Sequence, residues 1–287
     1  MGVCLVAEPL LIAGVQMDVR LMDCEANLQR MLSALEETAA KGAALTVFPE
    51  CSLTGYCFES LAEARPFAET IPGPSTERFV EACRRLNTMA IYGLLEPEGD
   101  ALFNACVLVG PNGIVGSYRK IHLPYLGIDR FTSAGQQPFS VHETDSVQIG
   151  MNICYDSAFP ESARVMSLAG ADLIALPTNF PPGSECMVGH VINARAMENA
   201  VYYIAVNRAG NERGFRFIGG SKICDTNGNI LDQADHDGEA IIYGEIDVDM
   251  ARNKQRVRVP DKHVIHRFQD RRPEMYKTIA ETDTHTR

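Results

Sequence analysis

The chain alternates two patterns of hydrophobic positions along most of its length. Short apolar runs, typical of β-strands, occur at residues 11–17, 44–48, 89–95, 102–109, 113–119, 147–153, 172–176, 201–207, 220–224 and 240–248. Between several of these runs, apolar residues recur every three or four positions, which predicts helices over residues 24–41, 79–86, 160–169 and 186–200. Ser75 and Thr76 are candidate caps for the second helix, whereas Gly189 weakens the prediction for the middle of the fourth.

The order of these elements predicts an α/β protein with mixed sheets. Pro111-Asn112-Gly113 and Asn227-Gly228 are hairpin turn signals, so some neighbouring strands should be antiparallel. Residues 42–50 and 170–178 share a helix-stopping glycine, an apolar run and a proline, which indicates two similar halves packed sheet against sheet. Because no segment is long enough to serve as a linker, we predict a single domain over residues 1–287.

Composition narrows the class of protein. Hydrophobic residues at 46% and charged residues at 22% are typical of a globular chain, and the net charge of −11 argues against a general nucleic-acid binder. The longest apolar runs are strand-sized, and residues 1–6 lack both a basic segment and an adequate apolar run. We therefore predict neither a membrane span nor a signal peptide.

The cysteines and histidines do not suggest a metal site. The nine cysteines form no C-x-x-C pair, which favours reduced thiols and a cytoplasmic location. His263 and His266 could share a helix face, but no neighbouring residues complete a ligand set. No metal and no other cofactor are expected.

Three chemically active side chains each close an apolar strand. Glu50 and Lys120 stand at two of these strand ends, and Cys154 lies where a third strand gives way to a turn before Pro160 and Glu161. A cysteine in this position, with free backbone N–H groups beside it, is a candidate nucleophile, although a buried cysteine is also an ordinary core residue. The ordered set of acid, lysine and cysteine favours the catalytic interpretation.

The motifs around these residues resemble the nitrilase, or carbon–nitrogen hydrolase, superfamily. The matching segments are F-P-E with a nearby G-Y at 48–56, Y-R-K-x-H-L-P at 118–124, I-C-Y-D followed by F-P-E at 153–161, and the segments 176–179, 195–199 and 271–276. They span nearly the whole chain and resemble the amidase-like branch. The resemblance implies a four-layer αββα sandwich, in which two mixed β-sheets pack face to face with helices outside.

The same resemblance assigns roles that the chemistry of these side chains allows. Cys154 would form a thioester with the substrate. Glu50 would accept the thiol proton, pass it to the leaving nitrogen and then activate water. Lys120 would favour the thiolate and stabilise the oxyanion, with the backbone N–H of Tyr155 as a second donor. Further substrate-binding residues are expected at Tyr56, Asn179 and Asp129.

The loop between Lys120 and Cys154 departs from the family pattern. Many members carry a second glutamate there, but alignment places Ile128 at that position, and Asp129 is the only acid nearby. Whether Asp129 replaces the glutamate stays open. Arg130 could pair with Asp129 or receive an acidic substrate group.

A histidine-assisted cysteine is the competing mechanism. His122 lies two residues beyond Lys120 and would share its face on a strand, but we interpret His122 as structural. Cys51 and Cys57 do not stand where a strand meets a helix, and we interpret both as core or lining residues.

The leading functional hypothesis is a hydrolase that cleaves a small carboxamide and releases ammonia. A nitrilase is an alternative, but that branch typically follows its cysteine with Trp-Glu, whereas this chain has Tyr155-Asp156 and no tryptophan. N-carbamoyl amino acid hydrolysis stays open because Arg130 or Arg195 could bind a carboxylate. The non-enzyme alternative is an inactive scaffold of the same fold.

Residues 249–287 begin as a charged segment and then become aromatic and basic. The sequence predicts irregular structure at 249–258. The superfamily packs such a C-terminal extension against a neighbouring subunit, so the resemblance implies a homodimer or higher homo-oligomer. The other expected partners are a small amide substrate and water, with no nucleic acid and no membrane.

Overall fold

The computed structural model describes residues 9–281. The chain divides into two compact units, one ending at Arg252 and the other beginning at Asn253. Within the described residues, no helix is long and apolar enough to cross a membrane. The predicted single domain over residues 1–287 stays a prediction.

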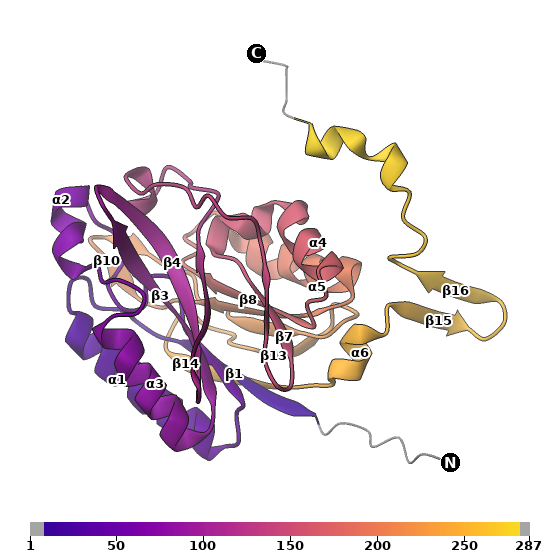
Figure 1. Ribbon diagram of the computed structural model, residues 1–287, viewed down its shortest axis with the longest axis horizontal. Coiled ribbons are helices and arrows are strands. Elements are labelled where there is room, and N and C mark those ends of the chain that lie inside the picture. Colours follow the sequence, from indigo (N-terminus) through magenta and orange to yellow (C-terminus); the bar gives the residue numbers. More distant parts are fainter. Residues whose placement is uncertain (1–8, 282–287) are drawn as a thin grey trace. The chain divides into compact units, whose positions relative to one another are not determined.

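The first unit contains two six-stranded mixed sheets (Figure 1). The first sheet has the order β14 (Ala240–Ile246), β1 (Leu10–Gln16), β2 (Leu45–Val47), β3 (Met89–Glu98), β4 (Ala101–Gly110) and β5 (Gly113–Arg119). The second has the order β13 (Ile230–Gln233), β12 (Lys222–Cys224), β9 (Tyr202–Asn207), β8 (Leu173–Thr178), β7 (Gln148–Met151) and β6 (Val141–Glu143). The predicted strands are confirmed as elements, with ends that differ by a few residues.

The two sheets repeat one pattern of strand directions. Three neighbouring strands run parallel in each sheet, β1–β2–β3 in the first and β7–β8–β9 in the second, and antiparallel strands flank them. Strands β2 and β8 occupy equivalent central positions, so the repeat between residues 42–50 and 170–178 reflects equivalent strands. Both predicted hairpins are present, β4–β5 and β12–β13.

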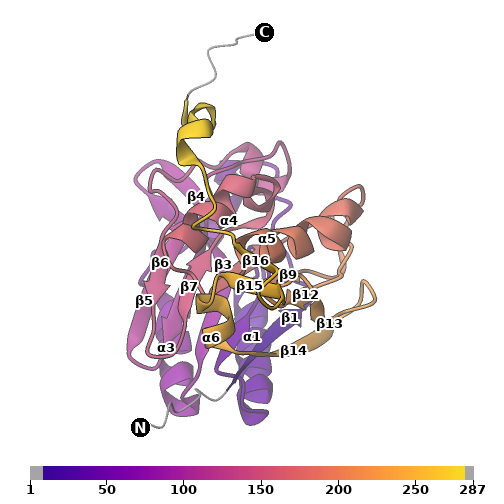
Figure 2. The ribbon, with the colours of Figure 1, turned by 90° about the vertical axis from the view of Figure 1, so that its right-hand side faces the viewer.

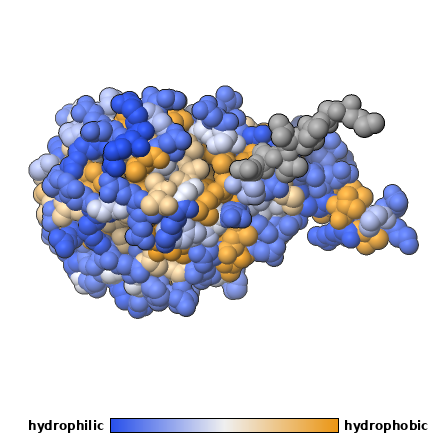
Figure 3. Space-filling model, turned by 90° about the horizontal axis from the view of Figure 1, so that it is seen from below, coloured by the Kyte–Doolittle hydropathy of each residue, from blue (hydrophilic) through white to orange (hydrophobic). Residues whose placement is uncertain are grey.

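Helices cover the outer faces of both sheets (Figures 1 and 2). Helices α1 (Cys24–Ala40) and α3 (Pro74–Leu86) bury their apolar faces against the first sheet. Helices α4 (Pro160–Leu168) and α5 (Ile192–Asn199) pack on the second. This arrangement confirms the four-layer αββα sandwich. The face seen in Figure 3 is mostly hydrophilic, with apolar side chains in small groups.

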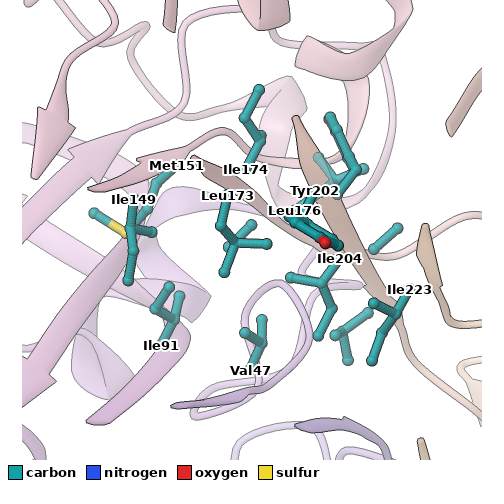
Figure 4. Close-up of a cluster of buried hydrophobic side chains, with 14 of the residues drawn as sticks. Val47, Ile91, Ile149, Met151, Leu173, Ile174, Leu176, Tyr202, Ile204 and Ile223 are labelled. Carbon is teal, nitrogen blue, oxygen red and sulfur yellow. The ribbon is translucent and has the colours of Figure 1, made fainter. Parts of the chain in front are cut away.

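One buried apolar cluster fills the space between the two sheets (Figure 4). The sheets approach closely at Gly14 of β1, where a Cβ atom would lie only 2.9 Å from Cγ2 of Val206 on the opposite sheet. A larger residue at position 14 would therefore push the sheets apart. The apolar side chains that fill this space include Val47, Ile91, Ile149, Met151, Leu173 and Ile204.

Two helix predictions need correction. Helix α3 begins at Pro74 with Gly73 as its N-cap, so Ser75 and Thr76 lie inside the helix. The Thr76 hydroxyl accepts a hydrogen bond from the Gly73 N–H at 2.7 Å and so still satisfies a backbone group at the helix start. The helix predicted over residues 186–200 is a π-helical stretch, Met187–Val191, followed by α5.

Several short elements were not predicted. Strand β6 and the small hairpin of β10 (Asn211–Glu212) and β11 (Phe215–Arg216) are too short to show a hydrophobic period. The four-residue helix α2 (Leu61–Ala64) was missed for the same reason. Tertiary pairing, rather than local pattern, creates such elements.

The irregular structure predicted at residues 249–258 is wrong. Helix α6 (Val248–Arg252) ends the first unit, and the second begins with a hairpin of β15 (Gln255–Val259) and β16 (His263–His266). Two 3₁₀-helices follow, Pro273–Met275 and Lys277–Ala280. His263 and His266 stand on a strand, where residues three apart point to opposite faces, so they do not share a helix face.

Candidate active site

The predicted acid and lysine meet in a buried cluster. Glu50 follows β2, and Lys120 immediately follows β5. Lys120 Nζ lies 2.6 Å from Oε1 of Glu50 and 2.5 Å from Oδ2 of Asp129. All three side chains are completely shielded from solvent. Ile128, which aligns with the second glutamate of the family, has no carboxylate. Its neighbour Asp129 is the residue that presents a carboxylate to Lys120.

Two further residues complete this cluster. The amide nitrogen of Asn104 donates to Oε1 of Glu50 at 2.7 Å and to Oδ1 of Asp129 at 2.9 Å. The Tyr56 hydroxyl donates to Oδ2 of Asp129 at 2.8 Å. Sequence analysis missed Asn104, although an amide within the apolar strand β4 was an available signal, because buried polar groups need hydrogen-bond partners.

The main chain of Glu50 is also held in place. The Asn179 side chain donates from Nδ2 to the Glu50 carbonyl oxygen at 3.0 Å. Gly93 of β3 lets this segment pack directly against the strand, because a Cβ at Gly93 would lie 2.3 Å from the Cys51 nitrogen. The carboxylate oxygen Oε2 of Glu50 is buried and has no hydrogen-bond partner among the described residues.

Cys154 stands in a strained conformation at the predicted turn. It opens the 3₁₀-helix Cys154–Ala158, shortly after β7, and its side chain is buried. Its φ angle is +47°, in the left-handed region that costs a non-glycine residue about 1–2 kcal/mol. Strain of this kind concentrates at functional sites, where the surrounding structure enforces it.

Asp156 connects the Cys154 turn to the segment after β5. Its carboxylate accepts from the Ile153 N–H at 2.9 Å and from the Tyr118 hydroxyl at 2.7 Å. It also lies 2.7 Å from Nδ1 of His122, whose ring stacks on Phe159 with centroids 3.7 Å apart. This placement supports the structural interpretation of His122.

Burial and charge determine the protonation states in the cluster. Burial raises the pKa of Glu50, because it outweighs the attraction of Lys120. Burial alone would lower the pKa of Lys120, but the carboxylates of Asp129 and Glu50 raise it well above its ordinary value. Burial and the nearby Glu50 raise the pKa of the Cys154 thiol to about 12, although Lys120 acts in the opposite direction. At neutral pH the sulfur therefore carries its proton, and it needs a base during attack.

Both arginines considered as binding groups for an acidic substrate already have hydrogen-bond partners. Arg130 does not form the expected ion pair with Asp129 but donates to the carbonyl oxygens of Gly127 and Phe58. Arg195 donates to the carbonyl oxygens of Ser157 and Ala158 and pairs with Glu198 at 2.9 Å. Cys51 is a fully buried core residue, and Cys57 is partly buried.

Known proteins with similar sequences support the family resemblance that the motifs indicated. The carbon–nitrogen hydrolase family matches residues 11–256. A nitrilase from Pyrococcus abyssi is 38% identical over 268 residues, which cover 92% of this chain and 98% of the relative. An omega-amidase from Homo sapiens is 29% identical over 263 residues, which cover 87% of this chain and 91% of the relative.

A solved structure supports the fold. An amidase from Nesterenkonia sp. AN1, with the acetamide moiety of fluoroacetamide added covalently at its active-site cysteine, superimposes with a TM-score of 0.78. Its sequence is 23% identical, and the match covers 95% of this chain and 97% of that one. Since the family match spans most of the chain and relatives align over nearly their whole length, this protein belongs to the carbon–nitrogen hydrolase family and is an enzyme of the nitrilase superfamily.

Proposed function

We propose that this protein hydrolyses small carboxamides through a thioester on Cys154 and releases ammonia. The observation that carries the proposal is the buried cluster of Glu50 and Lys120, in which one Glu50 oxygen binds the lysine and the other has no hydrogen-bond partner within residues 9–281. A thiol whose pKa is raised to about 12 needs a base, and the free oxygen of Glu50, a stronger base because burial raises the pKa of its carboxyl group, can accept the proton.

The first half of the reaction forms the acyl-enzyme. Oε2 of Glu50 takes the thiol proton while the sulfur of Cys154 bonds to the carbonyl carbon. An ammonium group has three donors, and Lys120 uses two of them on Glu50 and Asp129, which leaves a third for the developing oxyanion. The backbone N–H of Tyr155 is the second proposed donor. Glu50 then gives its proton to the nitrogen, the C–N bond breaks, and ammonia leaves.

The second half releases the acid. Glu50 takes a proton from water, the resulting hydroxyl group attacks the thioester carbonyl, and the C–S bond breaks. The proton returns from Glu50 to sulfur, so one amide and one water yield one carboxylic acid and one ammonia. Tyr56 and Asn179 are proposed to shape the substrate site from the positions that they hold around Asp129 and Glu50.

Nitrile hydrolysis is the second candidate, because the relative from Pyrococcus abyssi is described as a nitrilase. The same thiol would add to the nitrile carbon and give a thioimidate. For N-carbamoyl amino acids, the contacts of Arg130 and Arg195 favour neither arginine as a carboxylate receptor.

A screen for ammonia release tests the proposal. Simple aliphatic carboxamides, N-carbamoyl amino acids and nitriles are incubated with wild-type protein and with Cys154→Ala. We expect turnover of carboxamides by the wild type and none by the variant, because removal of the sulfur eliminates the covalent route. Cys186→Ala is the matched control, since Cys186 is exposed and should not affect activity. Residual activity above a few per cent in Cys154→Ala, or no ammonia from any carboxamide, would refute the proposal.

A further inference from the structure

Asn104 is a buried polar residue with an unusual set of partners. It stands in β4, between apolar residues that are themselves buried, and none of its surface is exposed. Both amide hydrogens point to carboxylates, at 2.7 Å to Glu50 and 2.9 Å to Asp129. The side-chain oxygen lies 3.5 Å from the Cys51 sulfur, which donates to it. One neutral amide therefore links two acids that would otherwise repel each other.

The main chain of Asn104 reaches the third charged residue. Its carbonyl oxygen accepts a hydrogen bond from the Lys120 backbone N–H at 2.8 Å, just beyond the end of β5. Asn104 thus contacts Glu50 and Asp129 through its side chain and Lys120 through its main chain. A change in this side chain alters the two carboxylates directly, while the backbone contact to Lys120 is independent of side-chain identity.

The hydrogen bonds distinguish the two oxygens of Glu50. Oε1 accepts from both Lys120 at 2.6 Å and Asn104 at 2.7 Å, whereas Oε2 has no partner in the part of the chain that the structure describes. A carboxylate fixed through one oxygen cannot rotate freely, because rotation would break both charge-assisted bonds. Oε2 is the oxygen that remains available for proton transfer.

We propose that Asn104 is a positioning residue that fixes the Glu50 carboxylate through Oε1 and so reserves Oε2 as the base for Cys154. This inference rests on the proposed function. Asn104 touches no substrate atom in this scheme, and its effect on the reaction passes through Glu50.

The pH dependence of the reaction separates this role from ordinary packing. Donation from Asn104 favours the charged form of Glu50, so loss of the amide should move the acid limb of the kcat/KM profile to higher pH. A packing defect would lower activity without moving that limb. The other titratable groups that face Glu50 are Lys120, Asp129, Cys51, Tyr56, Cys106 and Cys154, and all are retained in the variants below.

Asn104→Leu and Asn104→Asp are compared with the wild type on a carboxamide substrate. Asn104→Leu removes both donors at similar volume, and we expect kcat to fall about 10- to 100-fold, as for a lost hydrogen bond to a charged group. Its acid limb should move up by about one pH unit. Asn104→Asp keeps the shape but adds a third acid, so its acid limb should move at least as far.

Asn27→Leu is the matched control. Asn27 is also fully buried, and its amide nitrogen donates at 2.7 Å and 2.9 Å, but to the carbonyl oxygens of Arg20 and Leu53. Its loss should lower thermal stability and leave the acid limb unchanged. If both Asn104 variants are folded and keep the wild-type limb, Asn104 is only structural and the proposal is overturned.

The rate of Cys154 alkylation by iodoacetamide provides a readout that needs no turnover. It is measured against pH by mass spectrometry of the modified peptide. In the wild type, the rate should rise with ionisation of Glu50, and in both Asn104 variants this rise should occur at higher pH. Absence of amide hydrolysis by the wild type would refute the proposed function alone. An unchanged alkylation profile in the variants would refute the role of Asn104.

Discussion

Replacement of Lys120 by methionine should destabilise the protein, and the cost should grow with pH. The side chain keeps its length but loses its charge, and two fully buried carboxylates, Glu50 and Asp129, lose a partner at 2.6 and 2.5 Å. Removal of one member of a buried ion pair costs about 3–5 kcal/mol.

The direction of the pH effect follows from proton linkage. A carboxyl group whose pKa is higher in the folded than in the unfolded protein destabilises the fold at pH values above its folded pKa. That penalty shrinks as the pH falls and disappears below the unfolded value, which is about 4. Burial already raises the pKa of Glu50 in the wild type, and loss of Lys120 raises it further. The difference between variant and wild type should therefore be larger at pH 8 than at pH 5.

Urea unfolding at pH 5 and pH 8 measures this effect. Circular dichroism is the suitable signal, because the chain has no tryptophan. Lys222→Met is the matched control: Lys222 is also buried, but it donates to Asn193 at 3.2 Å, and burial lowers its pKa. Its loss should cost no more than about 1 kcal/mol, the value of a typical hydrogen bond, and the cost should not grow with pH.

Two results would contradict the reasoning about Lys120. One is a destabilisation below about 1 kcal/mol at pH 8, which would mean that Lys120 does not form buried ion pairs with the two carboxylates. The other is an equal cost at both pH values, which would mean that Glu50 does not take up a proton when the lysine is lost. Activity should fall at least about a hundredfold in the same variant, because the proposed oxyanion donor is removed.

Three more predictions concern the chemistry and the assembly. Lys120→Arg should have little more activity than Lys120→Met, since a guanidinium is larger and directs its donors differently. The measurement is kcat on a carboxamide. Glu50→Gln should slow acylation and deacylation together, because it removes the proposed proton carrier of both steps. Rapid quenching and mass spectrometry measure acyl-enzyme formation, and formation at the wild-type rate would show that Glu50 is not the base. Residues after Asp261 should strengthen a homodimer, because this segment carries exposed apolar residues such as Val264 and Tyr276. Sedimentation of the intact and truncated chains measures the strength of the dimer. A fully active monomer of the intact chain would exclude this interface.

The local pattern of the chain was sufficient to locate the main elements. Helix α1 was predicted to within one residue, because its apolar positions recur at helical spacing up to Gly42. Strand β5 was predicted with the observed ends, because the Asn112-Gly113 turn precedes it and a proline follows soon after it. The sequence failed at residues 187–191, where a π-helical stretch replaces regular helix around Gly189. It also failed at the C-terminal hairpin, where strand pairing forms in a charged segment.

The sequence by itself indicated which residues we propose to carry the chemistry. Glu50, Lys120 and Cys154 each stand at the end of an apolar strand, and strand ends are set by local pattern and by prolines and turns nearby. Motif order then identified the superfamily. None of this required knowledge of distances, because residue type and spacing along the chain are sufficient for it.

Only the tertiary structure decided how these residues act on one another. The contacts of Asp129 with Lys120, and of Asn104 with both acids, join the end of β5, the 3₁₀-helix Gly127–Arg130 and the middle of β4. The free Oε2 of Glu50 and the positive φ of Cys154 likewise follow from the packing of separate segments. Electrostatic and hydrogen-bond energies depend on distances of a few ångströms and on burial, and no local sequence pattern determines either quantity.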